Sequence, residues 1–217
     1  MYYSQCGEDK FLNDTFFKNK KNGVYIELGA LNGVLISNTK FFEDKLNWKG
    51  ILIEPHPEEF ERLKCNRPHN KLFNDLVSYN SEPLVFRYFK DGYSAVSGVE
   101  NTLSQHHMDT YYENNSQHFK SFTQCRKTLI PRTLTEIVKS TDIKHIDFMS
   151  LDVEGHEYEV LQSWDFSIPI DLILIEMLGA QSEKDELCRR LLIGKGYVFI
   201  QKFHFNEIYV RNTSLFS

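Results

Sequence analysis

The stretch Gly23-Val24-Tyr25-Ile26-Glu27-Leu28-Gly29-Ala30-Leu31-Asn32-Gly33 decides the fold. Its first six residues form a short and nearly continuous apolar run, and two glycines follow at the spacing of a turn. A run of this kind that ends in a glycine turn is typical of a buried parallel strand leading toward a helix. Residues 37–39, Ser-Asn-Thr, supply N-cap side chains for a helix that we expect to continue to about Leu46.

The same alternation of strand and helix continues along the chain. We expect further strands at 50–54, 71–77, 83–89, 145–151 and 171–176, and a terminal hairpin of 197–200 with 207–210. We expect helices at 58–65, 134–140, 156–162 and 183–192. Short apolar strands that alternate with helices predict an α/β fold with a mostly parallel sheet and helices on both faces. The whole chain, 1–217, is expected to form a single domain.

The segment at about 91–124 departs from this pattern. It is polar, rich in His, Asn, Ser and Tyr, and is expected to hold one helix around 99–112. We interpret it as an inserted lid or substrate segment, and the alternative is a tolerated surface insertion. His106 and His107 lie in it without metal-ligand spacing, so we expect both to be solvated.

Composition excludes several classes of protein. Twenty-five Lys and Arg against 30 Asp and Glu give a net charge of −5, which argues against a nucleic-acid partner because the broad positive field that such binding needs is missing. No apolar run reaches the ~18 residues of a membrane span. The N-terminus shows no secretory signal pattern, and the four scattered cysteines favour a reducing compartment over a disulfide or zinc framework. We therefore expect a cytoplasmic protein, bacterial or viral in a host cell.

Acidic residues mark the ends of the expected strands. In open α/β sheets, ligands bind at the carboxyl ends of the strands. The dinucleotide fingerprint G-x-G-x-x-G is absent because Leu31 stands where a glycine is needed, which argues against a nicotinamide oxidoreductase. An acid two residues before Gly29 would repel a pyrophosphate and suits a cationic ligand. The acids at or just beyond strand ends are Glu27, Glu54, Asp75, Asp152, Glu154 and Glu176.

The order of the first three acids matches the parts of one cofactor. Glu27 is placed to bind an amino group, and Glu54, at the end of the second strand, can accept both hydroxyls of a ribose. Asp75 follows the third strand, where an adenine amino group would lie. Amino acid, ribose and adenine in this order describe S-adenosylmethionine. Taken singly, each acid has an ordinary alternative as a helix cap or a packing residue.

Several motifs resemble the FkbM-type S-adenosylmethionine-dependent methyltransferases. Residues 3–9 are similar to the family's YSQ-x-GED opening, 24–33 to its first cofactor motif, and 37–39 to its SNT. Residues 47–55 resemble its GW-x-G and EP, 67–68 its RP, and 150–161 its SLDVEG-x-E-x-EVL. The resemblance covers 3–176, most of the chain.

This resemblance implies a Rossmann-like class I methyltransferase sheet of seven strands with a C-terminal antiparallel hairpin. It also implies methyl transfer to oxygen, with a sugar hydroxyl of a glycan or glycosylated metabolite as the acceptor. The long 91–124 segment departs from the family pattern and leaves the acceptor undefined. By motif match, the cofactor contacts are Gln5, Glu27, Gly29, Ala30, Gly33, Asn38, Glu54 and Asp75, with Asp152 beside the transferred methyl.

The catalytic candidates follow the strand at 145–151. Asp152 is expected to act as a base for the acceptor hydroxyl or as a metal ligand, with Glu154 second. His156 is either a base or a solvent-exposed residue. A divalent ion such as Mg²⁺ would use Asp152 and Glu176, but capping of a loop by Glu176 is the favoured interpretation.

Two rival functions remain open at this point. One is an RNA ribose 2′-O-methyltransferase, which the net charge disfavours and Lys202, near the last strands, keeps open. The other is a non-catalytic S-adenosylmethionine-binding module, against which Asp152 and Glu154 speak.

Overall fold

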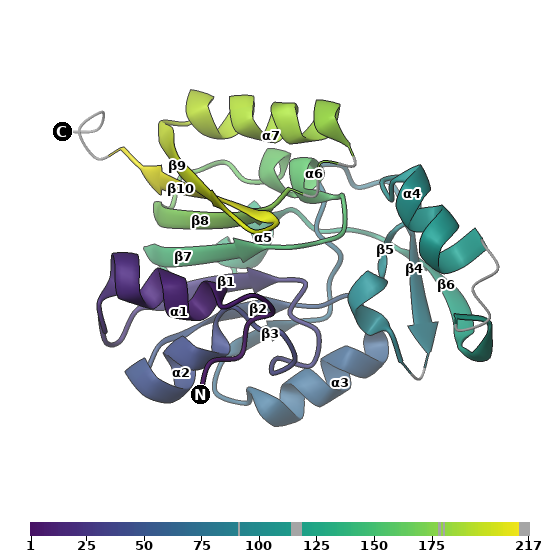
Figure 1. The fold of residues 1–217 in the computed structure, drawn as a ribbon, viewed down its shortest axis with the longest axis horizontal. Coiled ribbons are helices and arrows are strands. Elements are labelled where there is room, and N and C mark those ends of the chain that lie inside the picture. The colour runs from purple at the N-terminus through teal and green to yellow at the C-terminus, as the bar shows by residue number, and fades with distance from the viewer. Residues whose placement is uncertain (91, 114–118, 178, 180, 213–217) are drawn as a thin grey trace.

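A seven-stranded sheet forms the centre of the protein, in the order β3-β2-β1-β7-β8-β10-β9 (Figure 1). The structure is a computed structural model and describes residues 1–90, 92–113, 119–177, 179 and 181–212. The five strands from β3 to β8 are parallel, and β10 is antiparallel to both β8 and β9. The predicted mostly parallel sheet with a terminal hairpin is therefore confirmed. The strands are β1 Val24–Leu28, β2 Lys49–Ile53, β3 Lys71–Phe73, β7 Ile146–Leu151, β8 Ile170–Glu176, β9 Tyr197–Phe203 and β10 Asn206–Arg211.

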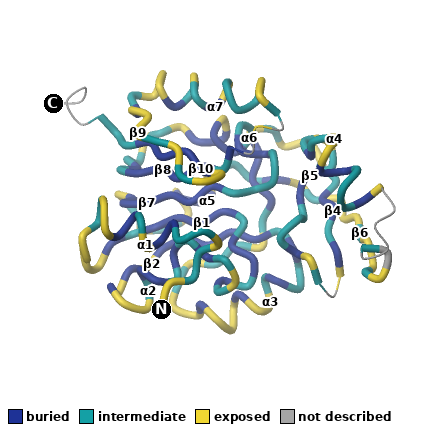
Figure 2. The backbone as a smooth tube through the Cα atoms, viewed as in Figure 1, coloured by how far each residue is buried: buried dark blue, intermediate teal, exposed yellow. Residues whose placement is uncertain are grey.

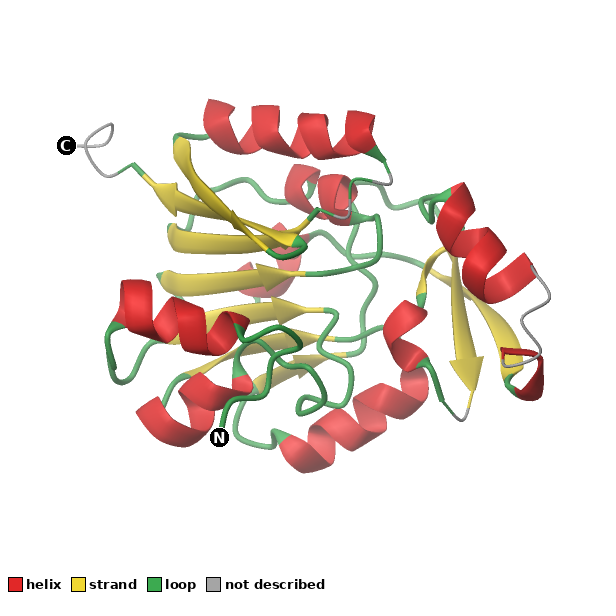
Figure 3. Ribbon diagram, in the orientation of Figure 1, coloured by secondary structure: helices red, strands yellow, loops and turns green. Residues whose placement is uncertain are grey.

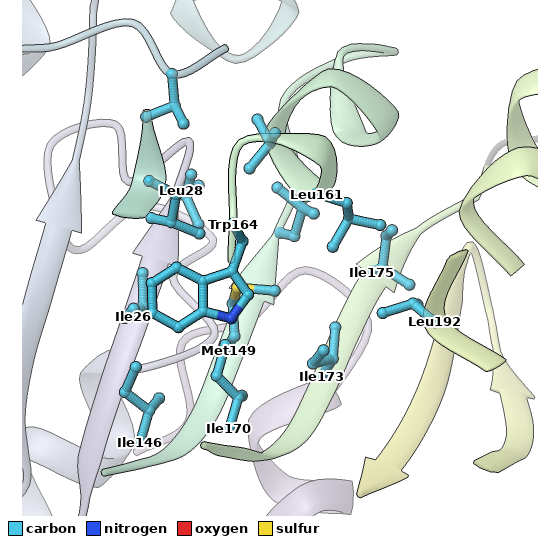
Figure 4. Close-up of a cluster of buried hydrophobic side chains, with 14 of the residues drawn as sticks. Ile26, Leu28, Ile146, Met149, Leu161, Trp164, Ile170, Ile173, Ile175 and Leu192 are labelled. Carbon is cyan, nitrogen blue, oxygen red and sulfur yellow. The ribbon is translucent and has the colours of Figure 1, made fainter. Parts of the chain in front are cut away.

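Helices cover both faces of this sheet, as the alternation of strands and helices predicts. Successive residues of β1 point to opposite faces: Tyr25 belongs to one buried cluster and Ile26 to the other. Figure 4 shows part of the second cluster, with Ile26 and Trp164 among side chains from the sheet and its covering helices. One face carries α1 Glu8–Leu12, α2 Lys40–Leu46 and α3 Pro57–Asn66, and the other carries α5 Leu134–Lys139, α6 Glu157–Gln162 and α7 Ser182–Gly194.

Burial follows these layers. The strands in the middle of the sheet are dark blue in Figure 2, and all six residues of β7 are buried. Strands covered on both faces need continuous apolar sequence, which explains why their runs show no alternation. In the part of the chain that the structure describes, no helix is long and apolar enough to cross a membrane.

Local signals fix where individual helices begin. Pro57 occupies the first turn of α3, and the His56 imidazole accepts from the backbone N–H groups of Glu58 and Glu59. At α5, the Thr133 hydroxyl and the Glu136 carboxylate form a reciprocal capping box.

A second, antiparallel sheet lies beyond the carboxyl ends of the parallel strands (Figures 1 and 3). Its order is β5-β4-β6, and we call residues 84–129 the inserted unit. The predicted segment 91–124 falls within it, although 91 and 114–118 lie outside the described residues, and its role as a lid or substrate segment stays a prediction. The elements are β4 Leu84–Lys90, β5 Gly98–Val99, β6 Thr123–Leu129 and α4 Gln105–His107, which continues as a π-helical turn, Met108–Glu113.

The strand expected at 83–89 is confirmed as β4, but two details of the predicted elements are wrong. The third strand stops at Phe73 instead of residue 77. The expected helix at 99–112 begins only at Gln105, because Ser104 caps it through a hydrogen bond from the His107 N–H. The second sheet was not foreseen because β6 is mostly exposed and polar and pairs with β4 across a long stretch of chain.

Candidate functional site

A cavity of about 470 Å³ lies at the carboxyl ends of β1, β2, β7 and β8, within the usual size range of ligand pockets. The inserted unit closes its other side through residues such as Val96 and His107. The described residues that line it include no lysine or arginine. The six strand-end acids of the sequence analysis all line it: Glu27, Glu54, Asp75, Asp152, Glu154 and Glu176.

The glycine turn after β1 forms one wall of the cavity. Gly29 has a φ of +74°, and a Cβ there would lie 1.9 Å from the Asp152 carbonyl oxygen. Only glycine therefore lets this turn pack against the loop after β7. The predicted contacts Gly29 and Ala30 line the cavity, whereas Gly33 does not. A Cβ at Gly33 would meet Leu63 and Arg67, so the structure gives this glycine a packing role under α3.

Glu27 is buried and held by donors on the same turn. Its carboxylate accepts from the Ser37 and Thr39 hydroxyls and from the Asn38 N–H, the last at 2.9 Å. Burial raises its pKa, and the buried Arg67 guanidinium, 3.9 Å away, opposes that rise. Asn38 also lines the cavity and donates to the Ser150 hydroxyl at 2.9 Å.

Arg67 lies beneath this wall and donates several of the hydrogen bonds that hold it. Its guanidinium is fully buried and donates to the Gly33 carbonyl at 2.7 Å and to the Tyr25 hydroxyl at 2.6 Å. It also contacts the Glu43 carboxylate and donates to Thr39. The RP motif at 67–68 thus supports the predicted cofactor turn from below and does not line the cavity.

Glu54 lies just after β2 and is fixed by backbone donors. Its two carboxyl oxygens accept from the N–H groups of Leu31 and His56, each at 2.7 Å. Burial raises its pKa to about 7. Asp75 follows β3 and pairs with Arg132 at 2.9 Å. Both acids line the cavity, and their contacts with a ribose and an adenine remain predictions.

The N-terminal segment lies against the cavity. Gln5 is one of its lining residues, and Ser4 pairs with Ile36 in an isolated bridge. The buried Asp9 carboxylate accepts from the Ser4 hydroxyl at 2.7 Å and from the Tyr3 N–H at 2.6 Å. Hydrogen bonds within the opening motif therefore hold Gln5 in place.

The carboxylates of Asp152, Glu154 and Glu176, here called the acidic cluster, face one another. Each offers an oxygen, and these atoms all lie within 4.8 Å of one another. Burial, and then mutual repulsion, raise the pKa of Glu176 and Glu154. Burial also raises the pKa of Asp152. A hydrogen bond from Glu176 partly offsets this rise. The cluster thus holds protons near neutral pH, with Asp152 the most readily ionised of the three.

Three clustered carboxylates are also hard oxygen ligands of the kind that Mg²⁺ prefers. The cluster contains the predicted pair, Asp152 and Glu176, and adds Glu154. This donor set fits a divalent ion, and a bound ion stays a prediction.

His156 lies beside the cluster and is buried, so the alternative of a solvent-exposed residue is wrong. Its Nδ1 lies 3.0 Å from the Thr102 hydroxyl. Burial, helped by the nearby Lys184 ammonium, lowers its pKa to about 3. At neutral pH its imidazole is therefore neutral and weakly basic, which suits a base less well than Asp152 or Glu154.

His107 was missed by the sequence reasoning. Although expected to be solvated, it is 7% exposed, lines the cavity and places Nδ1 3.4 Å from a Glu154 carboxyl oxygen. No local spacing signals this contact, because the two residues lie on segments that meet only in the tertiary structure.

The sequence profile of the Methyltransferase FkbM domain matches residues 27–206. No curated protein matches the chain. Among solved structures, the chain is similar to the methyltransferase FkbM from Methylobacillus flagellatus KT, with a TM-score of 0.53 and 13% identity. That similarity covers 88% of this chain but only 44% of the Methylobacillus chain, so this chain spans less than half of that protein's length.

A second similar structure is a TehB-like SAM-dependent methyltransferase from Corynebacterium glutamicum, with a TM-score of 0.45 and 7% identity over 98% of this chain and 89% of that one. A third is a methyltransferase from Pyrococcus furiosus, with a TM-score of 0.43 and 12% identity over 94% of this chain and 81% of that one.

Proposed function

The chain belongs to the FkbM methyltransferase family, and from that premise we propose that it is an S-adenosylmethionine-dependent O-methyltransferase acting on a sugar hydroxyl. The observation that carries this proposal is the charge of the cavity. Six carboxylates and no lysine or arginine line its described part, which suits a cationic cofactor and a neutral acceptor. The acids of this lining that are ionised repel phosphate groups, and no lysine or arginine of the described lining offsets them.

The residues of the cavity wall after β1, β2 and β3 support the proposed binding mode of the cofactor. Glu27 and Asn38 would hold the amino-acid end, the Glu54 carboxylate would accept from the ribose hydroxyls, and Asp75 would lie near the adenine. Gly29 and Ala30 bring backbone close to the ligand, and Gln5 reaches the cavity from the N-terminal segment. When bound, the cofactor supplies an activated methyl group for in-line transfer.

The acidic cluster would serve the acceptor. A sugar hydroxyl is a poor nucleophile, and a positioned base that takes its proton contributes typically 10²–10⁴-fold in rate. Asp152, the most readily ionised member of the cluster, is the best candidate, and Glu154 is second. The inserted unit, which lines the cavity with Ser94, Ser104 and Tyr111, would orient the acceptor.

The two rival functions receive less support. An RNA substrate would need cations near the site, and the described lining offers none. A binding module without turnover would not need three half-buried carboxylates held close together, since removing charged groups from water is costly.

Two measurements test the proposal. Calorimetry should detect binding of S-adenosylmethionine to the purified chain, and mass spectrometry should detect methylated product in a panel of glycans, glycosylated metabolites and nucleotide sugars. Running the panel with and without EDTA tests the divalent ion. We expect turnover with uncharged sugars, and nucleotide sugars should react poorly.

The matched control is Glu183→Gln, which removes an exposed acid of α7 that does not line the cavity. It should bind the cofactor as the unmodified chain does. Absence of cofactor binding in the unmodified chain would contradict the proposal. Binding with methyl transfer to RNA alone would replace the sugar by the RNA alternative.

A further inference from the structure

His107 is buried at the boundary between the inserted unit and the cavity. The aromatic side chains of Tyr111 and Tyr112 pack against its ring, with centroids 4.8 and 6.0 Å away. Tyr112 in turn donates to the Val96 carbonyl at 3.0 Å and stacks on Phe89. These ring contacts restrict the orientation of the imidazole.

The hydrogen bond of His107 fixes which ring nitrogen faces the cavity acids. Nε2 lies 2.9 Å from the Val96 carbonyl oxygen, and a carbonyl can only accept, so Nε2 carries the hydrogen. In the neutral ring, Nδ1 is then an acceptor, and it can accept a hydrogen bond from the Glu154 carboxyl group in its protonated form. This nitrogen lies 3.4 Å from Oε2 of Glu154.

The loop that carries Glu154 is held against the same inserted unit. Glu154 and Gly155 have φ values of +55° and +91°, so the loop turns sharply here. A Cβ at Gly155 would lie 2.8 Å from the Thr102 carbonyl oxygen, and the same carbonyl accepts from the Gln181 side chain at 2.6 Å. The inserted unit therefore packs against this loop at Thr102. His107 and Glu154 lie where the same two segments line the cavity.

We propose that His107 is a positioning residue that holds the Glu154 carboxyl group toward the acceptor. The inserted unit would then complete the transfer site as well as cover it. This inference rests on the proposed function and adds a residue that the family motifs quoted above do not contain. His107 acts through Glu154 and need not touch the acceptor.

The first test measures the contact itself and requires no acceptor. In protein labelled with ¹⁵N-histidine, Glu154→Gln should shift the Nδ1 resonance of His107 and leave that of His69, an exposed histidine outside the cavity, unchanged. An unchanged His107 resonance would overturn the proposal.

The second test separates positioning from folding. His107→Gln keeps a donor that can reach the Val96 carbonyl and removes the nitrogen that faces Glu154. We expect kcat to fall about tenfold to a hundredfold, as for other losses of alignment, with cofactor affinity and KM for the cofactor within about twofold. The control His69→Gln should retain full kcat.

A double-mutant cycle assigns the effect to Glu154. Because His107 acts through that carboxyl group, His107→Gln should cost little more once Glu154→Gln is present. Additive losses, or a kcat of His107→Gln equal to that of the unmodified chain, would overturn the proposal. Failure of the unmodified chain to bind the cofactor in calorimetry would instead contradict the proposed function and leave the resonance test as the measure of the contact.

Discussion

The two halves of the cavity use the same kind of side chain in opposite ways. In the half that we propose binds the cofactor, here the cofactor half, Glu27 and Glu54 are surrounded by donors: hydroxyls, backbone N–H groups and the nearby Arg67. In the half that we propose binds the acceptor, here the acceptor half, Asp152, Glu154 and Glu176 face mainly one another. The first half is prepared for a ligand before it binds. The charge of the second half depends on the protons or cations that it holds.

The largest expected effect is a loss of methyl transfer from a change confined to the acceptor half. Asp152→Ala removes the most readily ionised carboxylate of the cluster, so methyl transfer should fall by about 10²–10⁴-fold. Cofactor affinity should stay within a few-fold, since the cofactor half remains intact. Steady-state kinetics and calorimetry measure the two quantities, and Asp142→Ala, a highly exposed acid, is the control. If Asp152→Ala keeps normal turnover, its assignment as the base is wrong.

The next largest effect is a loss of stability when the buried cation beneath the cofactor half is removed. Arg67→Met leaves Glu43 and Glu27 without their buried cation and should lower the free energy of unfolding by about 3–5 kcal/mol. Arg62→Met is the matched control, because that arginine is 55% exposed and its ion pair with Glu59 should contribute under about 1 kcal/mol. Urea denaturation measures both. Equal losses of unfolding free energy in the two variants would show that the buried Arg67 stabilises the fold no more than the exposed Arg62 does.

A pH series sharpens the comparison within the cofactor half. The pKa of Glu54 is raised to about 7, and its ionised form is the better acceptor for ribose hydroxyls. Cofactor affinity should therefore rise about tenfold between pH 6 and 8, as the carboxyl group loses its proton. Calorimetry across this range should show the rise in the unmodified chain and a flatter profile in Glu54→Gln. A fall in affinity with rising pH would contradict the role of Glu54.

The smallest expected effect concerns the rim of the cofactor half. Arg132→Gln removes the partner of Asp75, but both side chains are partly exposed, so solvent screens the pair. We expect a loss of under about 1 kcal/mol in unfolding free energy and a change of at most a few-fold in cofactor affinity. A larger loss would place Asp75 among the tightly held acids such as Glu27.

Local sequence predicted most of the central sheet because its strands are short, apolar and bounded by turns. The run 23–28 and the glycine turn after it became β1 and one wall of the cavity. The second sheet escaped prediction because β6 has no apolar run and pairs with β4 across a long stretch of chain. The third strand was drawn too long because Leu76 and Val77 are apolar, yet they pack outside the sheet.

Some features of the site could likewise be predicted from the sequence and others could not. The acids at strand ends could be predicted to meet, because parallel strands bring their carboxyl ends to one edge of the sheet. Gly33 followed the motif but packs under α3 and does not line the cavity. The burial of His156 and the contact of His107 with Glu154 could not be predicted, since both depend on where the inserted unit lies.

By itself, the sequence determined the alternation of short apolar strands with helices and the six acids at or just beyond the ends of those strands. These follow from residue type and periodicity, which act over a few residues. Only the tertiary structure decided which acids are paired and which repel one another, because that depends on donors and neighbours brought together from distant segments. The inserted unit placed His107 beside Glu154, and burial then lowered the pKa of His107 and raised the pKa of Glu154.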